Sequence, residues 1–403
     1  MTERSALRNR NFRIYFAGAV VSLHGLWIFR VALAWYAWQL TGSESWVGVI
    51  AFSQFAPAMF LGPLFGVIAD RFERRKLSML VNSGAALNMV VLTALTVTGN
   101  LSIEALAGVS LVQGMLEGAH TPVRMALVPG IVDRAELASA IASNSIAFNI
   151  SRVVGPAISG FIIVNWGVAV AFMVNGLTYV AIVVAVWIIA IKPREQRGTG
   201  PTDIWSQLME GINYIRQHAL LRIIMVAITI NTLFGRGVLE MMPAVADGIL
   251  QRGSGGLAIM TSAVGAGAVL TGLALARGTR WLGMRALKNA ILLSAVIIVV
   301  FGYSTNFYLS VAAVTLLGVV LSLAGVGSQI LIQSNVDDDV RGRVSSIWGM
   351  IAFGGTALGG LVIGVIADMA GLAPTLIVAG VLCLAVTVFL PVPAGSTTTQ
   401  SRA

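Results

Sequence analysis

The sequence predicts an all-α membrane protein in which twelve transmembrane helices form two six-helix, pseudo-symmetric bundles. Three observations lead to this prediction. The 403 residues are 57% hydrophobic and only 11% charged, with a mean hydropathy of +0.87, whereas a soluble protein is about a quarter charged. Apolar runs of about 20 residues, the length that crosses a bilayer, recur between short polar turns. Lysine and arginine are concentrated in alternate turns, as the positive-inside rule requires.

Short turns separate the first six apolar runs, so neighbouring helices must be antiparallel. Small or polar residues mark these turns, for example Gly42, Gly99-Asn100 and Gly167. A proline and a glycine, Pro129-Gly130, close the fourth run. The expected spans are Ile14–Trp38, Trp46–Ala69, Leu77–Thr98, Ile103–Val128, Ala138–Val164 and Val168–Ile191.

A long polar stretch, residues 192–218, interrupts this pattern. Its second part repeats apolar residues at helical spacing, from Ile204 to Ile215, which predicts an amphipathic helix at the inner membrane surface. Six further runs follow: Leu220–Met242, Gly256–Ala276, Arg285–Tyr303, Phe307–Ile332, Val344–Ala367 and Pro374–Leu390. We therefore expect an N-terminal bundle over residues 1–191, a cytoplasmic linker over 192–218, a C-terminal bundle over 219–391 and a polar tail over 392–403.

The distribution of positive charge sets the expected topology. The loops assigned to the inside hold nearly all of the lysines and arginines, whereas the outer loops hold only Arg252. This asymmetry places both termini in the cytoplasm. We expect the chain to lie in a bacterial cytoplasmic (inner) membrane. The formal net charge of +9 is explained by topology, so we expect lipid and no nucleic acid as a partner.

The sequence contains few signals of an enzyme or a metal site. The single cysteine, Cys383, lies in the last apolar run, so a disulfide framework is not available. No Walker-type phosphate loop is present, which argues against ATP as the energy source. We expect no bound metal, no cofactor and no catalytic residue set.

The loop between the second and third spans carries a dense charged motif. It resembles the signature loop of the major facilitator superfamily at five positions: Gly66, Asp70, Arg71, Arg74 and Arg75. Glu73 stands where the family usually has glycine. The alternative is an ordinary positive-inside hairpin. The resemblance implies a gating loop, and the expected depth of Arg124 suggests that it pairs with Asp70 to close the cytoplasmic side.

The fifth span contains a second motif, Ser151-Arg-Val-Val-Gly-Pro-Ala-Ile-Ser-Gly160. Gly155, Pro156 and Gly160 match the span-five pattern of drug:proton antiporters, and serines replace two glycines. A proline bends the helix and small residues let a partner helix approach. The alternative is a packing seam without directional meaning. Together with Gly25–Trp35 in span one, the motif resembles the exporter branch that includes macrolide efflux proteins and the enterobactin exporter.

Charged residues within the spans are the candidates for coupling, because each costs about 2.5–3.5 kcal/mol at the bilayer centre. Glu117 lies near mid-depth, and His120 and Arg124 follow it at i+3 and i+7, on one helix face. We expect Glu117 to face Arg30 or Arg152 and to act as a substrate or proton site; a fixed structural ion pair is the alternative. Arg236 and Glu240 are spaced i, i+4 and are expected to neutralise each other.

These observations favour a secondary active transporter that exports a small amphipathic compound, a drug-like molecule or a siderophore, in exchange for protons. Six repeated spans on each side of the linker support alternating access. Uptake of a sugar or metabolite by the same fold remains an alternative. A non-transporting membrane protein that serves in assembly or sensing is another, and loss of the in-span charges would have favoured it.

Overall fold

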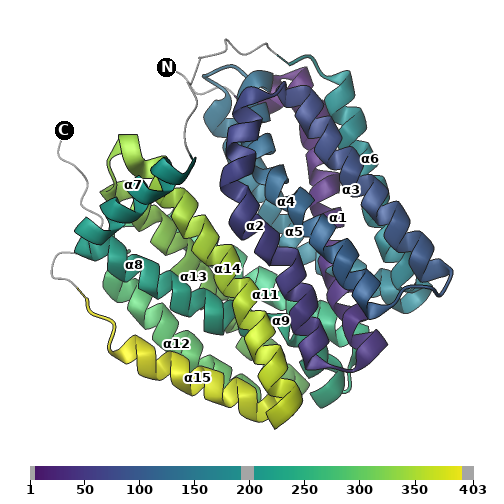
Figure 1. Cartoon of the computed structure of the whole chain (residues 1–403), viewed down its shortest axis with the longest axis vertical. Coiled ribbons are helices and arrows are strands. Elements are labelled where there is room, and N and C mark those ends of the chain that lie inside the picture. The colour runs from purple at the N-terminus through teal and green to yellow at the C-terminus, as the bar shows by residue number, and fades with distance from the viewer. Residues whose placement is uncertain (1–4, 192–203, 393–403) are drawn as a thin grey trace.

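The computed structural model describes residues 5–191 and 204–392, apart from the side chains of Gly62, Pro63, residues 66–71, Thr121, Ala126 and Ile204. Within these residues the chain is helical and contains no strand. Figure 1 shows two groups of helices, one drawn in purple to blue and the other in green to yellow. This arrangement confirms the predicted fold class of two helical bundles.

The N-terminal bundle consists of six long helices. Polar caps begin several of them: the Asn9 side chain accepts hydrogen bonds from the backbone N–H groups of Asn11 and Phe12, at 3.0 and 3.3 Å. Gly42, with φ of +59°, ends the first helix in the left-handed conformation that glycine tolerates. The helices are α1 (Arg10–Thr41), α2 (Glu44–Arg71), α3 (Arg74–Val97), α4 (Ile103–Ile131), α5 (Leu137–Trp166) and α6 (Val168–Ile188).

The C-terminal bundle begins with a broken helix. Its pieces are α8 (Ala219–Ile230), the π-helical turn η2 (Asn231–Arg236), α9 (Gly237–Glu240), α10 (Met242–Ala244) and the π-helical turn η3 (Val245–Ile249). The seventh span therefore reaches Ile249, seven residues beyond its expected end at Met242, because the helical stretch continues through two π-helical turns and a break at Met241. The remaining helices are α11 (Gly253–Ala276), α12 (Met284–Tyr303), α13 (Phe307–Asn335), α14 (Asp338–Ala370) and α15 (Leu372–Val388).

Each of the twelve expected spans coincides with a helical stretch. Counted over the described residues, nine of these stretches are long and apolar enough to cross a membrane. The other three positions are occupied by α2 and α4, which include side chains outside the description, and by α15, which has 17 residues. Large apolar side chains cover the outside of the bundles: Leu80, Leu177 and Leu273 are 70%, 61% and 54% exposed. Such a surface suits lipid, so the chain is a multi-pass membrane protein.

The helix expected within the linker is present as α7 (Ile204–Gln217), whereas residues 192–203 lie outside the described part of the chain. This helix packs against the first turns of α14. The Tyr214 hydroxyl donates to the Asp337 carboxylate at 2.9 Å, and Arg343 forms an ion pair with Glu210. The linker helix is thus attached to the C-terminal bundle, while Trp205 on its other side is 70% exposed.

The two bundles meet along two helix pairs, α2 with α14 and α5 with α11. We call the end of the bundles at which Arg10 and Val388 lie the terminal end, and the end at Thr41 and Ala370 the far end. Glycine lets the first pair approach closely near the far end: a Cβ placed on Gly364 would lie 2.4 Å from the backbone oxygen of Glu44. A side chain at this position would therefore push the two helices apart.

Polar contacts also join the bundles at the far end. The carboxylate of Asp368 accepts hydrogen bonds from the Ser43 hydroxyl at 2.7 Å and the Glu44 backbone N–H at 2.9 Å. The indole N–H of Trp38 donates to Asp247 at 2.9 Å. Toward the terminal end the second pair separates, since a Cβ on Gly272 of α11 would meet nothing described within 4 Å. The bundles are therefore closed at the far end and open toward the terminal end.

Candidate functional site

A cavity of about 480 Å³ lies between the two bundles, and both contribute to its wall. The N-terminal bundle contributes residues from all six of its helices, α1 to α6, and the C-terminal bundle contributes them from α8, η2, α9, α10, α11, α13 and α14. Its described charged lining consists of Arg30, Arg124, Arg152 and Arg236 with Glu117 and Glu240. The cavity therefore gathers the charges that the sequence places inside spans.

Glu117 and Arg30 form an ion pair on the wall of this cavity. One oxygen of the Glu117 carboxylate lies 3.1 Å from an Arg30 guanidinium nitrogen, and the two side chains are 15% and 23% exposed. The other Glu117 oxygen, Oε1, is buried without a hydrogen-bond partner in the described chain. This oxygen can accept a hydrogen bond from a further partner.

Aromatic faces hold Arg30 in place from two sides. Its guanidinium carbon lies 5.2 Å from the centre of the Trp27 ring and 5.4 Å from that of the Phe55 ring. Distances below about 6 Å give a favourable cation–π interaction. Arg30 is thus fixed by its own surroundings as well as by Glu117, and no sequence pattern indicated that Phe55 takes part.

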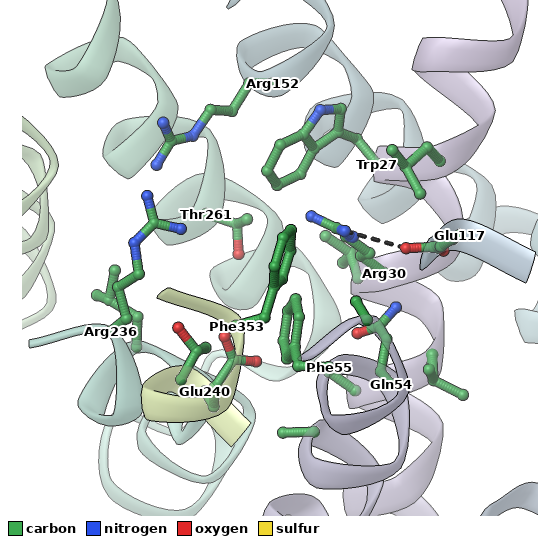
Figure 2. Close-up of a pocket in the computed structure, with 18 of the residues that line it drawn as sticks. Trp27, Arg30, Gln54, Phe55, Glu117, Arg152, Arg236, Glu240, Thr261 and Phe353 are labelled. Carbon is green, nitrogen blue, oxygen red and sulfur yellow. Dashed lines mark hydrogen bonds and ion pairs between the residues drawn. The ribbon is translucent and has the colours of Figure 1, made fainter. Parts of the chain in front are cut away.

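Arg152 and Arg236 come from opposite bundles, and their guanidinium groups point toward each other across the cavity (Figure 2). In the described part of the chain neither guanidinium forms an ion pair. Arg236 and Glu240 attract each other electrostatically, but they form no direct ion pair in the described residues. Arg236 ends a π-helical turn. That turn changes the register on which i, i+4 pairing depends. Arg152 lies over the Trp27 ring at 5.8 Å.

The remaining charges of α4 line the same cavity. Glu117, His120 and Arg124 all contribute to its wall, in keeping with their spacing along one helix face. A buried polar network that the sequence did not indicate lies nearby. The Gln113 amide donates to the Tyr179 hydroxyl at 2.8 Å and accepts from Asn88 at 3.1 Å. Tyr179 also reaches the cavity wall.

The gating-loop motif is only partly described. The side chains of Gly66, Asp70 and Arg71 lie outside the described residues, so the pairing of Asp70 with Arg124 stays a prediction. Arg74 opens α3, and Arg75 donates a hydrogen bond to the backbone oxygen of Trp187 near the end of α6. Arg75 therefore ties the start of the third span to the end of the sixth.

The span-five motif lies where α5 is pressed between α1 and α11. A Cβ on Gly155 would lie 2.5 Å from Trp27 Cβ, and a Cβ on Gly160 would lie 2.3 Å from Ala258 Cβ. The hydroxyl of Ser159 donates to the Ile28 backbone oxygen at 2.8 Å. Pro156 lies within α5 between these contacts. The small residues thus place α5 against its own bundle on one side and the opposite bundle on the other.

Three curated relatives resemble the chain along nearly its whole length. They are the staphyloferrin A transporter of Staphylococcus aureus, with 24% identity over 93% of this chain and 94% of that protein, macrolide efflux protein A of Streptococcus pyogenes, with 22% identity over 94% and 95%, and the enterobactin exporter EntS of Shigella boydii, with 24% identity over 88% and 84%. The resemblance to the exporter branch is therefore confirmed.

The fold is shared with solved transporter structures. A bacterial homologue of the human lysosomal transporter Spinster, in an inward-facing and occupied conformation, superimposes with a TM-score of 0.74 at 12% identity, over 95% of this chain and 96% of that one. A family model described as a transmembrane secretion effector matches residues 1–401. The chain belongs to this transmembrane secretion effector family of the major facilitator superfamily.

Proposed function

We propose that the protein is a secondary active exporter that moves a small amphipathic compound out across the bacterial cytoplasmic membrane in exchange for protons. The observation that carries this proposal is the Arg30–Glu117 pair on the wall of a cavity between the two bundles. A carboxylate at such a position can exchange its arginine partner for a proton. The names of two relatives, an efflux protein and an exporter, support the outward direction.

Protonation of Glu117 would change the balance of charge in the cavity. When ionised, the carboxylate compensates Arg30; when neutral, it releases Arg30 to other partners. Burial favours the neutral form and the neighbouring arginine favours the charged form, so any rearrangement of the bundles alters the affinity for a proton. Each proton that enters along a membrane potential of 100 mV supplies about 2.3 kcal/mol. That energy can move substrate against its gradient.

Alternating access would come from rocking of the two bundles about the cavity. With the terminal end assigned to the cytoplasm from its lysines and arginines, the conformation described here is inward-facing. The rocking units are the bundles proposed at residues 1–191 and 219–391, with the linker at 192–218 and the tail at 392–403. In the outward-facing state, Asp70 and Arg124 would help to close the cytoplasmic side.

Transport by the purified protein in lipid vesicles tests the proposal. Radiolabelled probes, namely a macrolide, enterobactin and staphyloferrin A, are offered to vesicles with an imposed pH difference. An antiporter accumulates its substrate on the acidic side whichever way it is inserted, because protons leave that side as substrate enters. We expect such accumulation for at least one probe, and its loss when a protonophore removes the gradient. Accumulation on the alkaline side would identify uptake by symport and contradict the proposal.

A further inference from the structure

Two arginines face each other in the cavity with incomplete compensation, since Glu240 attracts Arg236 without a direct ion pair. Arg152 comes from α5 of one bundle and Arg236 from η2 of the other, and their guanidinium groups point toward each other (Figure 2). Neither forms an ion pair in the described chain. Glu117, the carboxylate that could neutralise Arg152, is already paired with Arg30 at 3.1 Å.

Close backbone packing fixes both arginines at these positions. A Cβ placed on Gly265 of α11 would lie 2.5 Å from the backbone oxygen of Arg152. A Cβ on Gly237, the residue after Arg236, would lie 2.7 Å from the backbone carbon of Gly359 in α14. The helices that carry the arginines therefore cannot turn away without losing a tightly packed contact.

The whole cavity shares this surplus of positive charge. Its described lining contains four arginines and two glutamates. Two like charges that face each other are unfavourable where water screens them poorly, and the two glutamates offset only part of the charge of the four arginines. Arginine forks bind acidic groups with two parallel hydrogen bonds, which suits a carboxylate, sulfonate or phosphate oxygen pair.

The rest of the wall suits the apolar body of such a compound. Trp27, Phe55, Phe148 and Phe353 line the cavity beside the arginines. Trp27 already contacts Arg152 and Arg30 through its ring face, so an aromatic or aliphatic group beside it would lie next to the positive charges.

We propose that the compound moved by this protein is an amphipathic organic anion, whose acidic group binds between Arg152 and Arg236 and so bridges the two bundles. Transport of this compound rests on the proposed function, whereas the anion site itself rests only on the cavity. Without an anion, repulsion between the arginines opposes closer approach of the bundles around the cavity. With an anion bound, the repulsion becomes attraction to a shared partner, which favours the closed arrangement.

Binding to the purified full-length protein tests the site with two matched pairs of probes. Naphthalene-2-sulfonate is compared with naphthalene-2-sulfonamide, and salicylate with salicylamide, by calorimetry at low and high salt. We expect at least one anion to bind at least tenfold more tightly than its neutral partner, and its binding to weaken with salt. Arg152→Gln and Arg236→Gln should each weaken anion binding about tenfold or more, because each removes a charge-assisted hydrogen-bonding partner.

Matched variants separate this role from a structural one. Arg277→Gln removes an exposed arginine at the end of α11 and should bind the anions like the parent. Arg152→Lys keeps the charge and should retain most of the preference for anions. In the absence of ligand, Arg152→Gln should unfold at the same temperature as the parent or a higher one, since it removes a repulsion. A clearly lower unfolding temperature would show that Arg152 serves stability instead.

The possible failures are distinguishable. Equal binding of the charged and neutral probes, absence of anion binding, or unchanged binding in both glutamine variants would overturn the anion site and leave the exporter proposal standing. Arginine-dependent anion binding combined with failure of every gradient-driven transport assay would contradict the exporter proposal and leave the anion site in place.

Discussion

One carboxylate and two aromatic rings hold Arg30, and this determines what a change at Glu117 would do. The Glu117 carboxylate lies on one side of the guanidinium, and the rings of Trp27 and Phe55 lie on others. Loss of the carboxylate's charge therefore leaves Arg30 with two contacts that do not depend on Glu117. Glutamine also preserves the size of the side chain and a hydrogen-bond acceptor, so the fold of such a variant should survive.

We predict that Glu117→Gln abolishes accumulation driven by a pH difference, while downhill exchange of substrate continues. The variant cannot take up or release a proton at this position, but it leaves the cavity open to substrate. Vesicle transport assays with and without the imposed gradient measure the two activities separately. Glu104→Gln is the matched control, because Glu104 is an exposed glutamate in the first turn of the same helix. Uphill transport by the Glu117 variant would exclude it as the coupling acid.

The sequence located the in-span charges and limited the partner of Glu117 to two arginines, but it did not distinguish between them. An apolar run makes Glu117 conspicuous, and helical spacing places His120 and Arg124 beside it. Whether Arg30 or Arg152 approaches Glu117 depends on how α1, α4 and α5 lie in space, which spacing along one chain does not contain. The direction of Arg236 depends on a π-helical turn, for which no sequence signal was found.

At the scale of elements, α5 connects the proposed coupling site with the contact between bundles. Its Ser159 hydroxyl is bonded to α1 at the Ile28 backbone oxygen, and Gly160, the next residue, touches Ala258 of α11. The span-five motif therefore packs at the boundary between the bundles, which the proposed rocking would move. The motif was visible in the sequence, whereas its second partner, α11 of the other bundle, was not.

We predict that Gly160→Leu shifts the protein away from the conformation described here. The larger side chain collides with Ala258, and overpacking of this kind costs about 1–3 kcal/mol. Since 1.4 kcal/mol changes an equilibrium about tenfold, the far end should open several-fold more often. A single cysteine at Thr41, in a Cys383→Ser background, reports this opening through its rate of labelling by a maleimide.

The control for this prediction is Gly272→Leu, on α11, because a Cβ there meets nothing described within 4 Å. It makes the same chemical change without a collision and should leave the labelling rate at Thr41 unchanged. A Gly160 variant that folds normally and labels at the parental rate would show that the α5–α11 contact does not control the far end.

At the scale of the whole molecule, hydropathy predicted nearly everything about the architecture. Twelve apolar runs became helical stretches, because backbone groups in lipid must be bonded within a helix. The largest departure was the seventh span, where two π-helical turns and a break at Met241 carry the helix on to Ile249. The sequence does not indicate which end of the bundles is closed, since the same sequence would adopt both the inward-facing and the outward-facing conformation of the proposed cycle.

The central claim is that the bundles rock about the cavity and that protons bias this motion. Distances between paired spin labels test it most directly, without knowledge of the substrate. One pair, Asn100→Cys with Thr305→Cys, spans the bundles at the far end; the other, Arg134→Cys with Arg280→Cys, spans them at the terminal end. All four positions are exposed, and Cys383, which is buried, is replaced by serine. As the pH is lowered from 8, we expect the two distances to change in opposite directions, and Glu117→Gln to remove the effect of pH. Distances that stay constant, or that lengthen and shorten together, would contradict alternating access coupled to protons.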